Sequence, residues 1–370
     1  MHIHAATAVI DNQLQEKVCV QSEHGLITAI SLNCSSVADL DVSGTLIPGF
    51  VDIHSHGGGG FYFSNTDVSS VKKARATHLE HGTTTMLASL VTEPIGILEE
   101  QIRRLAPLVD EGIFAGIHLE GPYLSHARCG AHQPSLLRSP DLDEIGALLD
   151  TAGDTITMIT LAPELEGGIS AVEYLHSRGV TVALGHSQAD SATTVAALSA
   201  GAALITHFSN GMPKPSNGSG TIAETALSLK DLPLELILDG VHVTDEVLST
   251  IKASGKNRFI LVTDAMSAAG QPDGKYSIGA LDVEVKDGVA RLTSNGSLAG
   301  STLTMDQAFK NYLSSGASLV ECVHATSVLP AQTLGLHDVG SITIGKKADF
   351  LEFTEAGEIK LLLTSSQVRA

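Results

Sequence analysis

Two histidines stand two residues apart, at His54 and His56, where an apolar run ends. On an extended strand, residues two apart point to the same face, so the two imidazoles would converge on one point. Imidazole nitrogen binds zinc, iron, manganese or cobalt, and two such ligands make half of a metal site. A His-x-His pair alone is a weak motif, and its weight depends on what accompanies it.

Four further residues that could bind a metal or move a proton also follow apolar runs: Glu120, His186, His207 and Asp264. A single histidine at the end of a strand is more often a solvated or capping residue than a ligand. Four histidines and two carboxylates after five separate runs are much harder to obtain by chance. Glu120, His186 and His207 would suffice for one metal with an open position for water, whereas two metals would divide the set between them.

The elements that must position these residues recur with a regular rhythm. Short apolar runs rich in Ile, Val, Leu and Thr alternate with stretches that have helical patterns, which indicates buried parallel strands in βαβ units. The runs are 46–53, 84–90, 113–119, 155–162, 180–184, 203–206, 234–238 and 259–263. The helical stretches are 67–81, 99–109, 141–151, 169–178, 191–200, 221–230 and 244–254. Eight strands predict a TIM (β/α)8 barrel, whose active site lies at the carboxyl ends of the strands.

The two ends of the chain read differently. Runs 17–23 and 26–32 alternate around a turn at Glu23-His24-Gly25, and 341–350 and 359–363 are also strand-like. We therefore expect a small β-sandwich domain built from both chain ends, 1–45 and 338–370. The barrel would occupy 46–337, with a β-hairpin insertion near 276–293.

Composition excludes some classes of function. The formal net charge of −19 argues against a nucleic-acid partner. The absence of a leader-like start and of an apolar run of about 18 residues argues against a membrane protein. Four scattered cysteines without a C-x-x-C pair predict reduced thiols and a cytoplasmic location.

Several segments together resemble the N-acetylglucosamine-6-phosphate deacetylases of the amidohydrolase superfamily. They are 48–57 (PGFVDIHSHG), 118–123 (HLEGPY), 184–187 (LGHS), 206–207 with 210–213 (TH and NGMP), 239–242 (DGVH), 261–265 (LVTDA) and 298–305 (LAGSTLTM). The match follows the whole barrel in order. It implies a metal-dependent hydrolase that converts N-acetylglucosamine 6-phosphate to glucosamine 6-phosphate and acetate.

The resemblance also implies roles for residues. Glu120, His186 and His207 would hold the metal that is always present, and His54 and His56 a second one. The metal would be zinc by preference, with iron, manganese or cobalt open. Asp264 would be the general acid and base, and His242 would help to stabilise the oxyanion. The substrate contacts would come from Ala131, His132, Asn210, Gly211, Asn217, Asp239, His242, Leu298, Ala299 and Gly300. Family precedent suggests a homodimer.

Two positions depart from the family pattern. Asn217 stands where many members carry an Arg that grips the sugar phosphate, and Gly211 stands where Ala is usual. An Arg makes bidentate contacts that Asn cannot. The phosphate could instead rest on His132, Lys214 and backbone N–H groups. The substrate could also be N-acetylgalactosamine 6-phosphate or an unphosphorylated sugar.

Other interpretations remain open. Amidohydrolases of the dihydroorotase type bridge two metals with a carboxylated Lys on strand 4, but the segment 161–164 (LAPE) has no Lys there. A scaffold that had lost its metal should lack several ligands, and none is missing. Cys129, in the predicted substrate loop, is either an oxidisable thiol or an inert small residue.

Overall fold

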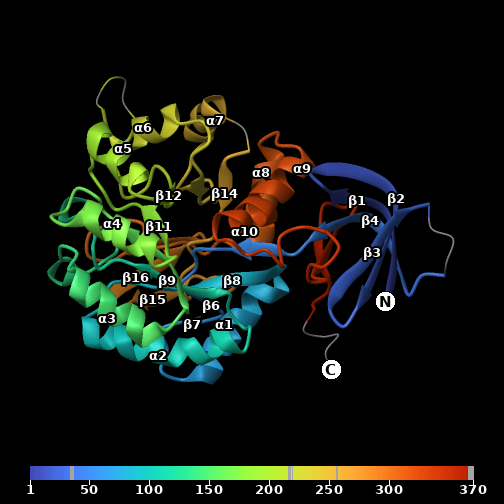
Figure 1. Cartoon of the computed structure of the whole chain (residues 1–370), viewed down its shortest axis with the longest axis horizontal. Helices are drawn as coiled ribbons and strands as arrows, with labels where there is room; N and C mark the ends of the chain where they lie inside the picture. The colour runs from blue at the N-terminus through green and yellow to red at the C-terminus, as the bar shows by residue number, and fades with distance from the viewer. Residues whose placement is uncertain (34–36, 216–217, 219, 256, 366–370) are drawn as a thin grey trace. The chain divides into compact units, whose positions relative to one another are not determined.

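The computed structural model describes residues 1–33, 37–215, 218, 220–255 and 257–365 (Figure 1). The chain forms two compact units, one comprising Met1–Asp52, His78–Thr85 and Met305–Ala370 and the other Ile53–Thr77 and Met86–Thr304. The first unit therefore includes the helices that follow residue 304 as well as the strands of both chain ends. The domain boundaries at 45/46 and 337/338 stay a prediction.

Eight parallel strands form a nearly closed barrel (Figure 1). In sheet order they are β5 (Phe50–Asp52), β8 (Thr83–Leu90), β9 (Gly116–Glu120), β10 (Ile156–Leu161), β11 (Thr181–Leu184), β12 (Ala202–Ile205), β13 (Leu234–Leu236) and β14 (Phe259–Leu261). At the carboxyl ends the ring closes, because Ser55 forms a parallel bridge with Ala265. The predicted TIM (β/α)8 barrel, with additional strands from both termini, is confirmed.

The helices between the strands begin where the sequence supplies capping side chains. Asp141, Asp190, Thr221 and Thr244 each accept a hydrogen bond from a backbone N–H of the first turn that follows, which satisfies donors that a helix start leaves free. The helices are α1 (Val68–Glu80), α2 (Ile95–Asp110), α3 (Leu142–Ala152), α4 (Gly168–Ser177), α5 (Ser191–Ser199), α6 (Ile222–Ser228) and α7 (Asp245–Ser254). After them come α8 (Met305–Ser314), α9 (Leu319–Val323) and α10 (Leu329–Thr333).

Strands from both chain ends share one six-stranded sheet in the order β19-β18-β4-β1-β2-β3. They are β1 (His2–Ile10), β2 (Gln13–Glu23), β3 (Leu26–Leu32), β4 (Leu40–Pro48), β18 (Phe350–Phe353) and β19 (Ile359–Leu363). Apolar side chains from both ends, such as Ile3, Val20 and Phe350, pack in one buried cluster. This shared core explains why the two ends of the chain belong together.

The strand expected over 341–350 is wrong for most of its length, because β18 begins only at Phe350. Gly340 and Gly345 adopt positive φ angles of 84° and 89°, which bend the backbone out of a strand. Lys346 Nζ donates to the carbonyl oxygen of Val339 at 2.8 Å and holds the segment as a turn.

The expected single run 46–53 is also divided, since β4 ends at Pro48 and β5 begins at Phe50. Gly49 lies between them, and a Cβ atom there would meet Thr84 Oγ1 at 2.1 Å. The side chain of Thr84 therefore leaves room only for glycine at this break.

The insertion after β14 has three antiparallel strands, one more than the predicted hairpin: β15 (Gly274–Ile278), β16 (Leu281–Lys286) and β17 (Val289–Leu292). The chain turns between β16 and β17 at Asp287 and Gly288, whose φ angles are positive, 52° and 74°. Asp273 accepts from the backbone N–H groups of both turn residues, which ties β15 to the hairpin.

Among the described residues, no helix is long and apolar enough to cross a membrane. Cys129 and Cys322 are free thiols, but Cys19 is disulfide-bonded. The expectation of reduced thiols is therefore wrong for Cys19. It rested on the wide spacing of the cysteines along the chain, which does not limit what the fold brings together.

Candidate metal centre

The predicted ligands and the predicted base Asp264 lie at or just after the carboxyl ends of barrel strands, and three of these residues owe their direction to an unusual backbone. His186, His207 and Asp264 have positive φ angles of 47°, 23° and 47°. A non-glycine residue in this region is strained by about 1–3 kcal/mol. The turn that follows each strand directs these side chains into the mouth of the barrel. The strained backbone lowers the stability of the fold, but it places the three side chains at the site.

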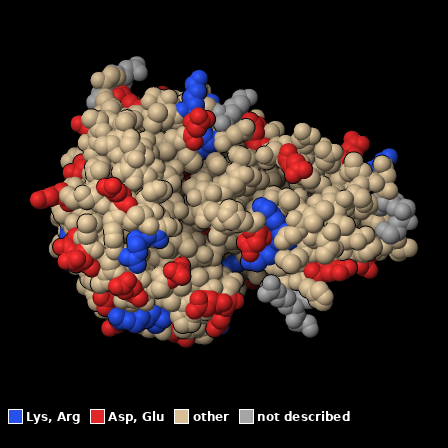
Figure 2. Space-filling model, in the orientation of Figure 1, with Lys and Arg blue, Asp and Glu red and all other residues tan. Residues whose placement is uncertain are grey.

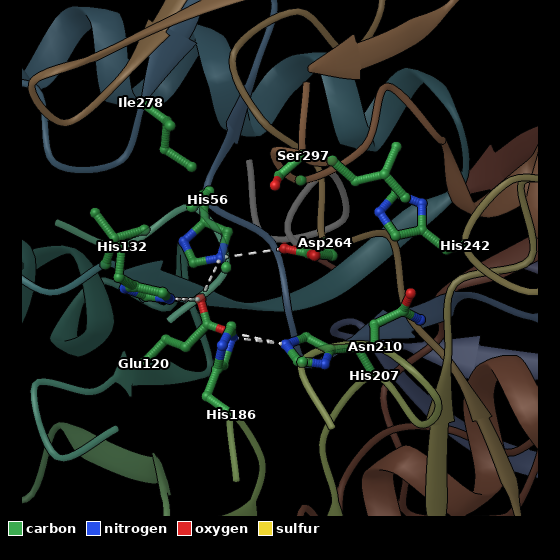
Figure 3. A pocket seen from close by; sticks show the side chains of 16 residues that line it. His56, Glu120, His132, His186, His207, Asn210, His242, Asp264, Ile278 and Ser297 are labelled. Atoms are coloured by element: carbon green, nitrogen blue, oxygen red, sulfur yellow. Dashed lines mark hydrogen bonds and ion pairs between the residues drawn. The ribbon is translucent and has the colours of Figure 1, made fainter. Parts of the chain in front are cut away.

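The first group of ligands is a triangle. Glu120 Oε1 lies 3.0 Å from the Nε2 atoms of both His186 and His207, and those two Nε2 atoms lie 3.0 Å apart (Figure 3). Ligands about 2.0–2.1 Å from a tetrahedral zinc ion lie roughly 3.3 Å from one another. The triangle is close to that size.

The second group shares Glu120 with the first. His56 Nε2 lies 3.3 Å from Glu120 Oε2 and 3.3 Å from Asp264 Oδ1 (Figure 3). His54 Nε2 lies 3.3 Å from His56 Nε2 and 3.7 Å from Asp264 Oδ1. Glu120 therefore stands between two clusters of nitrogen donors.

Hydrogen bonds at the rear of the rings determine what the ring nitrogens present to the site. His186 Nδ1 lies 2.8 Å from the carbonyl oxygen of Arg128, and His54 Nδ1 lies 3.1 Å from Glu235 Oε2. Each partner accepts the Nδ1 proton, so each ring, when it is neutral, presents the lone pair of Nε2 to the site. Lone pairs that face the Glu120 carboxylate repel it unless a positive charge lies between them. The donor set thus fits a divalent cation.

The ionisation of the buried groups agrees with this. Burial alone would raise the pKa of Glu120, but the neighbouring His54 and His132 hold that pKa well below its usual value. Burial likewise opposes the ionisation of Asp264, yet His54 and His56 lower its pKa to about 2. For His54, burial lowers the pKa, and the carboxylates of Glu120 and Asp264 outweigh it and raise that pKa well above its usual value. The site favours positive charge at its centre.

His132 was predicted to contact substrate, and the structure places it among the ligands. Its Nε2 lies 3.3 Å from Glu120 Oε2, and it forms with Glu120 and His186 a group whose donor atoms could share a cation. Burial lowers the pKa of His132, with His186 and His56 adding to that effect and Glu120 opposing it. The ring is therefore disposed to stay neutral beside Glu120.

A cavity of about 270 Å³ opens above the clusters (Figure 3). Most predicted site residues line it: His56, Glu120, Ala131, His132, His186, His207, Asn210, Gly211, His242, Asp264, Leu298 and Gly300. His54 lies fully buried beneath them, in contact with His56. Ala299 does not line the cavity and packs instead in the buried apolar cluster around Met266. Asn217 lies outside the described residues.

Asp239 acts on the cavity through His242. Its Oδ2 lies 2.7 Å from His242 Nδ1, and its Oδ1 accepts from the backbone N–H groups of Val241 and His242. Despite burial, these contacts with His242 lower the pKa of Asp239. The ionised Asp239 fixes the ring of His242 with Nε2 left for the cavity.

Sequence reasoning missed some residues of the site. Val91, Gly130, Ile278 and Ser297 complete the lining, and Ile278 comes from the insertion. Glu235 lies fully buried beneath His54. Its signal in the sequence was a charged residue within the apolar run 234–238, which calls for buried partners.

The comparisons with known proteins agree with this geometry. The model of the amidohydrolase family matches residues 45–368, and the chain belongs to that family. It is 34% identical over 350 residues to the N-acetylgalactosamine-6-phosphate deacetylase of Escherichia coli O157:H7, covering 93% of this chain and 92% of the relative. It is 33% identical over 346 residues to the N-acetylglucosamine-6-phosphate deacetylase of Vibrio furnissii, covering 91% and 86%.

Solved structures give the same result. An N-acetyl-D-glucosamine-6-phosphate deacetylase mutant from Mycobacterium smegmatis, in complex with N-acetyl-D-glucosamine-6-phosphate, superposes with a TM-score of 0.95 at 37% identity, covering 99% of this chain and 98% of that one. The N-acetylglucosamine-6-phosphate deacetylase of Thermotoga maritima has a TM-score of 0.90 at 33% identity, with 99% and 98% covered. The chain is similar to these enzymes over its whole barrel and both ends.

Proposed function

We propose that this chain is a metal-dependent deacetylase that hydrolyses the acetamido group of N-acetylglucosamine 6-phosphate to glucosamine 6-phosphate and acetate. The observation that carries the proposal is the convergence of Glu120, His186 and His207 on one point, with Asp264 facing the same cavity. Similarity over more than nine-tenths of the chain to deacetylases of phosphorylated N-acetyl sugars supports the substrate class.

Glu120, His186 and His207 would hold one divalent cation, and His54 and His56 a second. Imidazole and carboxylate ligands suit zinc best, and they also suit iron, manganese and cobalt. When bound, a divalent cation supplies Lewis acidity and lowers the pKa of a coordinated water to about 7.

Asp264 carries the proton transfers. Its pKa of about 2 keeps it ionised at neutral pH, so it can take a proton from the attacking water. The water oxygen bonds to the acetyl carbon, the C–N bond then breaks, and Asp264 delivers the proton to the departing sugar nitrogen. Acetate and the free amine result, and Asp264 returns to its ionised form.

His242 faces the same cavity and would help to stabilise the oxyanion that forms on the acetyl oxygen. Asp239 supports this role because its carboxylate holds the ring of His242 in place through Nδ1. Asn210, Gly211, Leu298 and Gly300 would contact the sugar, and Asp239 and Ala299 would act on it through their neighbours.

None of the described residues that line the cavity is Lys or Arg, so the lining offers no cationic side chain of that kind to the phosphate. This favours a homodimer in which a second copy contributes to phosphate binding, which light scattering coupled to size-exclusion chromatography would test. The face shown in Figure 2 carries acidic side chains with basic ones scattered among them. Phosphate binding therefore depends on local donors.

A cytoplasmic location follows from the substrate, because a sugar phosphate carries charge that does not cross a bilayer unaided. Cell fractionation would test it. The disulfide at Cys19 makes an oxidising compartment the alternative outcome.

Acetate release tests the function directly. N-acetylglucosamine 6-phosphate, N-acetylgalactosamine 6-phosphate and unphosphorylated N-acetylglucosamine are compared at equal concentration with metal-loaded protein. Fastest turnover of the first supports the proposal. Fastest turnover of the second keeps the chemistry and assigns the chain the substrate named for its Escherichia coli relative. No turnover of any of them, with metal bound, excludes all three substrates.

A further inference from the structure

A ring of hydrogen bonds lies beneath the metal ligands and passes from strand to strand around the barrel. It begins and ends at the adjacent residues Ser55 and His54. Its members, in order, are Ser55, Ser89, His118, Thr160, Thr206, Glu235 and His54. These side chains are all buried.

The donors and acceptors in the ring run in one direction. Ser55 N donates to Ser89 Oγ at 3.0 Å, and Ser89 Oγ lies 2.9 Å from His118 Nδ1. His118 Nε2 lies 2.8 Å from Thr160 Oγ1, which lies 3.1 Å from Thr206 Oγ1. Thr206 uses its one hydroxyl proton on Glu235, so Thr160 must donate to Thr206 and His118 Nε2 to Thr160, which leaves His118 Nδ1 to accept from Ser89.

Three hydrogen bonds converge on one oxygen atom of Glu235. Glu235 Oε2 accepts from Thr206 Oγ1 at 3.0 Å, from the backbone N–H of His207 at 3.1 Å and from His54 Nδ1 at 3.1 Å. Glu235 Oε1 is buried and makes no hydrogen bond. All the hydrogen bonds that this carboxylate accepts therefore come from His54, His207 and Thr206.

We infer that Glu235 is a positioning residue that fixes the tautomer of His54 and the backbone of His207, and so couples the two halves of the metal centre. A carboxylate cannot donate, so it holds a proton of His54 at Nδ1 and leaves Nε2 on the side of the ring that faces the site. The same atom holds the N–H of His207, whose φ of 23° is strained. The buried carboxylate of Glu235 therefore orients one ligand residue in each half of the metal centre.

A neutral replacement would weaken this control. In Glu235→Gln the amide can turn its NH2 group toward His54, which would move the ring proton to Nε2 and block that ligand. When a residue that hydrogen-bonds a metal ligand is replaced, the affinity of the protein for the metal typically falls about 10–100-fold. The inference rests on the metal site of the proposed function, but it does not depend on the substrate.

The test measures zinc affinity by competition with a chromophoric chelator, without substrate. We expect Glu235→Gln to weaken zinc binding about 10–100-fold. Glu235→Asp keeps the carboxylate but moves it away from its three donors, and it should also weaken zinc binding. In a proton spectrum, the wild type should show a downfield N–H resonance from His54, and Glu235→Gln should lose it.

The matched control is Glu352→Gln. Glu352 is also a buried strand carboxylate that accepts from a hydroxyl and a backbone N–H, those of Ser43 and Gly44, but it lies in the end sheet. Thr160→Val interrupts the ring upstream and leaves the three donors of Glu235 in place. Both variants should bind zinc as the wild type does.

Wild-type affinity in Glu235→Gln and Glu235→Asp would overturn the inference, as would equal losses in Glu352→Gln or Thr160→Val. A wild type that binds no zinc would overturn it together with the proposed metal site. A wild type that binds zinc and releases no acetate would leave this inference supported and remove only the proposed substrate.

Discussion

The Nε2 atoms of His186 and His207 lie 3.0 Å apart, although the two rings meet nearly edge to face at 86°. They follow neighbouring parallel strands, β11 and β12, whose carboxyl ends meet at the same edge of the barrel. Two imidazole nitrogens at this distance from each other and from one carboxylate oxygen make a triangle close to the size that the ligands of one cation form. Four predictions follow from this site and from the scaffold around it.

Glu120→Gln should lose metal more completely than any histidine variant, because Glu120 Oε1 faces His186 and His207 while Oε2 faces His56 and His132. We expect zinc affinity to fall by more than about 100-fold, which exceeds the effect of removing an indirect partner. Metal analysis after gel filtration measures it. Glu144→Gln, whose carboxylate pairs with Arg138 at the surface, should keep full metal content.

Asp264→Asn should keep its metal and lose turnover. A general acid and base contributes about 10²–10⁴-fold to rate, so we expect kcat to fall by that factor. Acetate release and metal analysis on the same preparation measure both quantities. If the variant loses metal and turnover together, Asp264 is a ligand and its proposed role as base is wrong.

The pair formed by His81 and Asp306 should make stability depend on pH. His81 Nδ1 lies 3.0 Å from Asp306 Oδ1, and this hydrogen bond raises the pKa of His81 despite partial burial. A raised folded-state pKa stabilises the fold below the unfolded value of 6.5, and the stabilisation disappears as the pH rises through the folded value.

The melting temperature of Asp306→Asn should therefore differ more from wild type at about pH 5.5 than at about pH 8.5. In a His81→Gln background the same substitution should produce a difference that is independent of pH. A wild-type difference that is constant across this range would refute the linkage.

Arg258→Met should destabilise the second compact unit. Arg258 is only 1% exposed, and it donates from Nε to Leu232 O at 2.9 Å and from Nη2 to Ala226 O at 2.6 Å, near the end of α6. Loss of both charged hydrogen bonds should lower the free energy of unfolding by about 2–4 kcal/mol. Urea denaturation measures it. Arg291→Met removes an exposed arginine that bonds Gly296 O and should change stability by no more than about 0.5 kcal/mol.

The sequence was most informative where one rule linked position to chemistry. Parallel strands place their carboxyl ends together, so His54, Glu120, His186, His207 and Asp264 could be grouped before any coordinates were known. The same rule does not cover residues carried by loops. His132 was expected to contact substrate and it lines the cavity, but its distance of 3.3 Å from Glu120 could not be predicted.

Other features could not be predicted because they depend on partners far away in the chain. Glu235 belongs to no motif, and its function depends on His54, 181 residues away. The segment 341–349 has the composition of a strand, yet it turns at two positive-φ glycines, and the backbone of Gly345 and Lys346 bonds Ile27 near the other end of the chain. Tertiary contacts decided both cases, as they commonly override local preference.

The left-handed backbone at His186, His207 and Asp264 has an evolutionary consequence. Glycine adopts that conformation with little strain, so replacing any of these three residues by glycine would relax the barrel while disabling the site. A lineage released from selection for this chemistry could therefore gain stability by losing these side chains. An intact set of three such residues in a related genome would accordingly indicate continued use of the reaction more strongly than conservation of the core does.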